Sequence, residues 1–152
     1  MKKVLIMINT IVLISLIAFL PTILAKETQM RFFGVGADVK VGNQGEYTIV
    51  TKGEKAEEGF VHTATEKFSK KEIKFKVELK GQDKVLLKIQ ETDARGRFIK
   101  EEKQAIELTQ DWKLYEVPFV LVSLESQIDV LVVTESQRQT EFQFKNLLVG
   151  SK

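Results

Sequence analysis

The strongest constraint on the fold is a two-residue alternation of apolar and charged side chains that begins after residue 70. From Glu72 to Lys80, Ile, Phe, Val and Leu alternate with Glu and Lys. Lys84 to Thr92 repeats the pattern after a turn at Gly81 to Asp83. Because successive side chains of a β-strand point to opposite faces, each segment predicts a strand with one buried face and one solvated face.

Further strands are predicted on both sides of this pair. Their expected ranges are Met30–Val41, Tyr47–Thr51, Gly59–Thr63, Phe98–Leu108, Trp112–Val122, Gln127–Thr134 and Thr140–Val149. The segment Gln127–Thr134 carries apolar residues on both faces, so we expect a central strand that is covered on both sides. Short strands joined by turn residues, without an amphipathic helix of convincing length, predict an all-β chain folded as an antiparallel β-sandwich or barrel.

The first 25 residues have the order of parts of a secretory signal peptide. Lys2 and Lys3 precede an almost wholly apolar run from Val4 to Leu20, and Pro21 and Ala25 lie where processing requires them. The sequence therefore predicts a signal peptide over residues 1–25 and a single β-sandwich domain over residues 26–152. An uncleaved anchor is the alternative, and it would be the protein's only contact with a membrane. Either way, we expect the domain outside the cell or at the cell envelope.

Charge and cysteine content exclude several classes of protein. The chain has 23 basic and 21 acidic residues. Lys2 and Lys3 are the only charged residues before Lys26, so residues 26–152 hold 21 of each sign and no net charge. Nucleic-acid binding depends on a surplus of Lys and Arg, so nucleic acid is not an expected partner. Without Cys, the chain forms no disulfide, thiolate metal site or lipid-linked cysteine.

Catalytic motifs find little support in the sequence. His62 is the only histidine, and no serine lies in a nucleophile-elbow context. The adjacent acids Glu57-Glu58 and Glu101-Glu102 lie in lysine-rich stretches and are interpreted as solvated. We therefore expect no enzyme. A small hydrolase would need two carboxyls across a cleft, or His62 beside a serine.

The stretch "ELTQDWKLYEVPFV", which begins at residue 107, concentrates aromatic residues around the only tryptophan, Trp112. The indole is either a stacking platform for a sugar ring or a plug at the edge of the core. The plug is the favoured interpretation, because Tyr115, Val117 and Phe119 fall on one side of the same predicted strand. Pro118 cannot donate a ladder hydrogen bond, so it predicts a sheet edge or a bulge.

Two motifs carry a resemblance to a known family. The stretch "LTQDWKLY", from Leu108, has the order leucine-threonine-x-x-tryptophan-x-x-tyrosine at the start of a strand. The last strand, "FKNLL", alternates apolar and polar residues, with Lys145 and Asn146 in place of an acidic pair. In these features the chain resembles carbohydrate-binding modules of the family 4/9 type, which are galactose-binding-like jelly rolls. The resemblance covers Glu46 to Val149.

The resemblance implies a β-sandwich of the jelly-roll type that binds a glycan and catalyses no reaction. It also implies a structural role for Trp112. Secreted jelly rolls of this kind often hold a structural Ca²⁺ near the chain ends. No acidic cluster in the sequence has recognisable Ca²⁺-ligand spacing, so we assign no calcium ligands and expect no other cofactor.

Candidate ligand-binding residues are polar side chains at outward strand positions and turns, together with the tryptophan. They are Lys88, Gln90, Arg97, Trp112 and Gln143. Lys74, Lys76, Lys88 and Gln90 are expected to project to one side of neighbouring strands. Their amides and cations suit sugar hydroxyls or acidic sugars, although the same alternation also fits a plain solvated face.

Two functions from different classes fit these observations. The first is a secreted, non-catalytic carbohydrate-binding module that holds a glycan or cell-wall polysaccharide at the cell envelope. The second is a structural or protein-interaction β-sandwich without a sugar site, with an envelope protein as its partner. Exposed aromatic side chains on one sheet face would favour the first. A purely charged face or a self-associating edge strand would favour the second.

Overall fold

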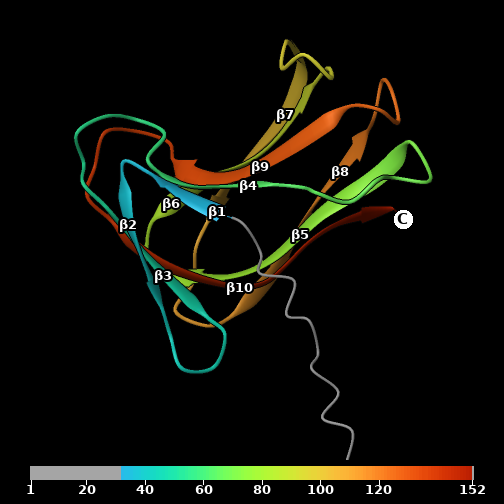
Figure 1. Ribbon diagram of the computed structural model, residues 1–152. Helices are drawn as coiled ribbons and strands as arrows, with labels where there is room; N and C mark the ends of the chain where they lie inside the picture. Colours follow the sequence, from blue (N-terminus) through green and yellow to red (C-terminus); the bar gives the residue numbers. More distant parts are fainter. Residues whose placement is uncertain (1–31, 152) are drawn as a thin grey trace, which may run out of the picture.

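The computed structural model describes residues 32–151, which form ten β-strands and, over this range, no helix (Figure 1). The strands are β1 (Phe32–Val35), β2 (Ala37–Val41), β3 (Tyr47–Thr51), β4 (Gly59–Thr63), β5 (Glu72–Gly81), β6 (Lys84–Thr92), β7 (Phe98–Glu107), β8 (Lys113–Val120), β9 (Gln127–Thr134) and β10 (Glu141–Ser151). Nothing in this range is a helix of the length and hydropathy that crossing a membrane takes. The predicted signal peptide or anchor, residues 1–25, lies outside the described residues.

The strands form two five-stranded antiparallel sheets that pack face to face (Figure 1). Sheet A has the order β1-β4-β9-β6-β7, and sheet B has the order β2-β3-β10-β5-β8. The predicted all-β sandwich is therefore confirmed. Strand β9 lies at the centre of sheet A with Val133 fully buried on its outer side, which confirms the expectation of a strand covered on both faces.

The core lies between the sheets and is built from the alternating apolar positions. It includes an aromatic cluster in which the ring of Phe144 stacks on Phe60 at 4.0 Å and on Tyr47 at 4.9 Å between ring centroids. Phe32 meets Phe144 edge-on at 5.4 Å. Such ring pairs contribute more than their buried area alone, so the cluster holds β1 and β4 of sheet A against β3 and β10 of sheet B.

The single strand predicted over Met30–Val41 is wrong, because the chain changes sheets inside it. Strand β1 ends at Val35 in sheet A, and β2 begins at Ala37 in sheet B. Gly36 between them has a φ of 60°, a left-handed conformation that favours glycine. An uninterrupted apolar pattern does not reveal such a crossing.

A second crossing separates lysines that were expected to lie on one face. Strand β5 pairs with β10 and β8, whereas β6 pairs with β9 and β7. The turn between them therefore carries the chain from sheet B to sheet A. Lys74 and Lys76 point outward from sheet B, while Lys88 and Gln90 point outward from sheet A, so the expectation of a shared face is wrong.

Candidate functional site

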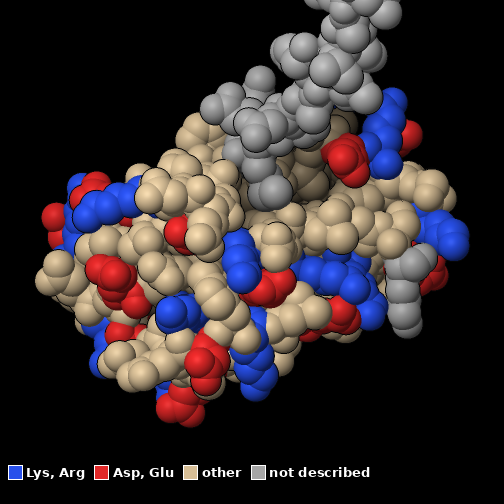
Figure 2. Space-filling view, turned by 90° about the horizontal axis from the view of Figure 1, so that it is seen from below, with Lys and Arg blue, Asp and Glu red and all other residues tan. Residues whose placement is uncertain are grey.

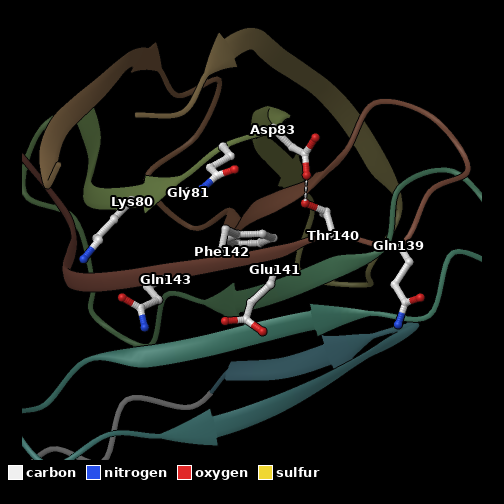
Figure 3. Close-up of a pocket in the computed structure, with 9 residues that line it drawn as sticks. Lys80, Gly81, Asp83, Gln139, Thr140, Glu141, Phe142 and Gln143 are labelled. Atoms are coloured by element: carbon white, nitrogen blue, oxygen red, sulfur yellow. Dashed lines mark hydrogen bonds between the residues drawn. The ribbon is translucent and has the colours of Figure 1, made fainter. Parts of the chain in front are cut away.

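The outer face of sheet B carries two adjoining hollows, which share Lys80 and Gln143. The smaller hollow, called here the Trp112 groove, has a volume of about 240 Å³ and is lined by Gln44, Glu46, Lys80, Trp112, Gln143 and Lys145. The larger, the end pocket, has a volume of about 490 Å³ and is lined by Lys80, Gly81, Gln82, Asp83, Gln139, Thr140, Glu141, Phe142 and Gln143 (Figure 3).

Strand register brings the groove residues together. Gln143 of β10 lies opposite Lys80 of β5 on one side and Thr48 of β3 on the other. Lys145, two residues further along β10, lies opposite Glu78. All these residues occupy outward positions between the buried residues of their strands, so their polar groups meet on the solvent side of sheet B.

Trp112 lies on this outer face and not in the core. Its side chain is half-buried and lines the groove, with the ammonium of Lys145 4.4 Å and that of Lys80 6.0 Å from the ring centroid. The favoured interpretation of Trp112 as a core plug is therefore wrong. The other part of that interpretation is confirmed, because Val117 and Phe119 are buried in the core.

A β-bulge in β10 shapes the wall of the groove. The register between β10 and β5 shifts between Lys145 and Leu148, and Asn146 has a φ of 50°. The extra residue lets Lys145 and Asn146 both stay on the solvent side before Leu147 returns to the core, as bulges commonly do when they redirect side chains. The Asn146 amide donates to Glu78 at 2.7 Å.

The groove holds two cations, Lys80 and Lys145, and one carboxylate, Glu46. Glu46 accepts the backbone N–H of Gln44 at 2.9 Å. The amide of Gln143 donates to the Thr48 hydroxyl at 3.3 Å. Lys145 lies 3.5 Å from the Glu78 carboxylate. Charges of both signs are interspersed on the face of the molecule that is seen from below (Figure 2).

The end pocket has a structural side and a solvent side. Asp83 accepts a hydrogen bond from the hydroxyl of Thr140 and forms an ion pair with Arg138 at 3.0 Å. These contacts tie the turn after β5 to the start of β10. The ring of Phe142 is buried in the core. Glu141 and Gln143 project from the opposite side of β10, and Lys80 projects from the neighbouring strand β5 (Figure 3). These side chains form the solvent side of the pocket.

Three of the predicted ligand residues lie away from this site. The side chain of Lys88 is 5% exposed on the outer face of sheet A, where its ammonium lies 3.1 Å from Glu57 and 3.4 Å from Glu101. Burial lowers the pKa of Lys88, but these carboxylates outweigh that effect and raise it. Gln90 donates to Glu101 at 2.8 Å. Arg97 binds Asp93 at 2.7 Å in the turn after β6.

The interpretation of the adjacent acids as solvated is wrong for Glu58, whereas Glu57 and Glu102 are exposed as expected. Glu58 is fully buried, and its carboxylate accepts the backbone N–H groups of Gly53, Glu54 and Lys55. Burial raises the pKa of Glu58, but these N–H donors outweigh that effect and lower it. Glu58 thus anchors the loop before β4. Within residues 32–151, no three His or acidic side chains are grouped closely enough to hold a metal ion.

Known proteins match this chain in structure and not in sequence. No family model matches it, and no curated protein does. A family 11 carbohydrate-binding module of a Clostridium thermocellum cellulosomal cellulase superposes with a TM-score of 0.63 at 13% identity, covering 84% of this chain and 91% of that one. A family 61 module solved with β-1,4-galactotriose superposes with a TM-score of 0.52 at 16% identity, covering 82% and 90%.

Larger proteins contain the same fold as one part. The enzymatically active domain of bacteriophage CBA120 tailspike protein 4 matches with a TM-score of 0.63 at 12% identity over 81% of this chain. The chain spans only 19% of that protein. The chain therefore has the jelly-roll fold of carbohydrate-binding modules, as the resemblance implied.

Proposed function

We propose that this chain is a non-catalytic, exported carbohydrate-binding module that holds a segment of polysaccharide in the Trp112 groove at the cell envelope. The observation that carries the proposal is the position of Trp112. Its half-buried indole lines a polar groove on a sandwich that has the fold of carbohydrate-binding modules. Export rests on the residue pattern over 1–25.

The groove offers the two kinds of contact that a sugar ring needs. The face of an indole provides a large apolar surface for the C–H face of a pyranose. The amides of Gln44 and Gln143 and the ammonium of Lys80 surround it with hydrogen-bond donors, and the two amides also supply acceptors. Because the end pocket adjoins the groove through Lys80 and Gln143, a second sugar unit has room beside the first.

The structural neighbours support the same class of ligand. The family 61 module was solved in complex with β-1,4-galactotriose, and a family 11 module with a mixed-linked β-1,3-1,4 tetrasaccharide. Both modules are covered over at least 90% of their own length by this chain.

The test is a binding screen with a matched pair of aromatic variants. The purified chain is run in affinity electrophoresis against neutral and acidic polysaccharides and against the wall fraction of the producing cells. W112A should weaken retention by the bound glycan at least about tenfold, because tryptophan contacts are commonly the dominant ones in an interface. F98A is the control, since Phe98 is 63% exposed on β7 and lies outside the groove.

Either of two results would contradict the proposal. One is the absence of retention by every polysaccharide and by the wall fraction. The other is retention that W112A leaves unchanged.

Edge strand β8 favours a second function, in which the sandwich associates with a protein partner. Leu114 and Val120 are 52% and 55% exposed on its outward side, and β8 ends the order of sheet B. Exposed apolar residues on an unpaired edge favour strand-to-strand association, although Pro118 limits it. An oligomer that dissociates on dilution and is lost in L114K would support this function, and a monomer at all concentrations would contradict self-association.

A further inference from the structure

We propose that the Trp112 groove selects acidic polysaccharide, with a uronic acid carboxylate held between the ammonium groups of Lys80 and Lys145. This inference rests on the proposed function, because it names the class of glycan that the same groove takes. It is carried by the position, partners and charge of the two lysines.

Lys145 occupies space that a stacked sugar would need. Its ammonium lies 4.4 Å from the centroid of the Trp112 ring, which is a cation–π contact. A neutral sugar that stacks on this ring has to displace the ammonium and offers it no counter-charge. A uronic acid places a carboxylate beside the ring, so the displaced ammonium gains an ion pair.

The lysines of the groove differ from their neighbours on the same face in how well they are neutralised. Lys74 and Lys76 both hold the carboxylate of Glu116 at 2.8 Å. For Lys80, by contrast, the described part of the chain provides no carboxylate within ion-pair distance, and its ammonium lies 6.0 Å from the centroid of the uncharged Trp112 ring. An ammonium in this situation is available to an anion.

Lys145 is only loosely paired. Its distance to the Glu78 carboxylate is 3.5 Å, and that carboxylate also accepts the Asn146 amide at 2.7 Å. The bulge after Lys145 holds both side chains on the solvent side. A ligand carboxylate can therefore take the ammonium of Lys145 while Glu78 keeps its contact with Asn146.

The balance of charge confines the acidic preference to one end of the site. Among the six residues that line the Trp112 groove, two are cations and one, Glu46, is an anion engaged with backbone. The end pocket has Glu141 on its solvent side (Figure 3). Its carboxylate would repel a sugar carboxylate in that pocket. We infer that the carboxylate-bearing unit stacks on Trp112 and that a neutral or esterified unit lies in the end pocket.

The experiment compares polymers that differ only in charge. Polygalacturonate and alginate are each paired with their carboxyl-reduced forms, which keep the linkages and lose the carboxylates. The purified chain should bind one of the acidic polymers at least about tenfold more tightly than its reduced form, and this difference should shrink as salt screens the groove. Polyglutamate serves as a polyanion without sugar rings and should not be retained in a Trp112-dependent way.

Lysine variants assign the preference to the groove. K80Q and K145Q should each lower affinity for the acidic polymer about three- to tenfold. Affinity for the reduced polymer should fall less than this in K80Q, because glutamine keeps a hydrogen-bond donor at the position, and should stay the same or rise slightly in K145Q. K76Q is the matched control, because Lys76 lies on the same face of β5 but is held by Glu116. It should bind both polymers as the unmodified chain does.

The outcomes separate the two proposals. Equal binding of acidic and reduced polymers, unaffected by K80Q and K145Q, would overturn acidic selectivity and leave glycan binding standing. Trp112-dependent binding of neutral glycans alone would also overturn acidic selectivity and leave glycan binding standing. Binding of polyglutamate as strong as that of the uronate polymers, unchanged in W112A, would reveal a general anion surface and overturn the inference. Retention of no polymer of any kind would overturn both proposals.

Discussion

Lys88 is a buried cation that two carboxylates hold on the outer face of sheet A. K88M keeps the apolar stem and removes the charge, so Glu57 and Glu101 lose their shared donor. Because these carboxylates are 50% and 27% exposed, solvent replaces part of the interaction. We expect a loss of about 1–3 kcal/mol in the free energy of unfolding, measured by urea denaturation, with glycan binding unchanged. Equal stability, or a loss of binding without loss of stability, would contradict this assignment.

The ion pairs of Glu116 on sheet B make the stability of the fold depend on pH. Hydrogen bonds from Lys74 and Lys76 lower its pKa from 4.5 to about 2. A carboxyl whose pKa is lower in the folded state stabilises the fold above its unfolded pKa and loses that effect as pH falls through the folded value. The urea concentration at the unfolding midpoint should therefore decrease as the pH is lowered from about 4.5 to about 2. The decrease should be smaller in E116Q. A parallel decline in both proteins would contradict the pKa assigned to Glu116.

Backbone contacts hold the loop between β3 and β4 in place. Alanine substitutions at two glycines, one inside this loop and one outside it, test this. Gly53 and Gly45 both have left-handed φ, 73° and 80°, so alanine strains either by about 1–2 kcal/mol. A Cβ on Gly53 also meets the backbone N of Gln139 at 2.6 Å, whereas on Gly45 it meets no described atom within 4 Å. G53A should therefore lower the free energy of unfolding more than G45A in urea titrations. Equal losses would show that the loop yields.

At the same scale, most strands were predictable from the sequence and the crossings between sheets were not. The ranges Tyr47–Thr51 and Gln127–Thr134 match the structure residue for residue, because a half-buried or buried strand shows its faces in the order of its side chains. The changes of sheet at Gly36 and at the turn before β6 depend on long-range pairing, which leaves no period in the sequence. They decided which polar residues share a face.

Trp112 shows how far the candidate site was predictable. The inward positions of Tyr115, Val117 and Phe119 favoured the core plug, but counting back along the same alternation places Trp112 on the outward side. Gln143 was correctly expected on an outward position. That these two residues share a hollow follows from the placement of β5 between β10 and β8.

For the whole molecule, the jelly roll gathers one site from segments far apart in the sequence. The Trp112 groove combines the turn before β3, the end of β5, the residue before β8 and the middle of β10. No two neighbouring strands of the chain supply it alone. The fold therefore acts as a scaffold for the groove. The central claim is that this groove binds a glycan.

The most direct measurement is the fluorescence of Trp112 during titration with the glycan that the binding screen retains. Trp112 is the only tryptophan and lines the groove, so its emission reports on this site without interference from another indole. We expect a saturable blue shift and protection from acrylamide quenching, with the midpoint at the dissociation constant from affinity electrophoresis. Saturable glycan binding that leaves both emission and quenching of Trp112 unchanged would place the site elsewhere and contradict the account.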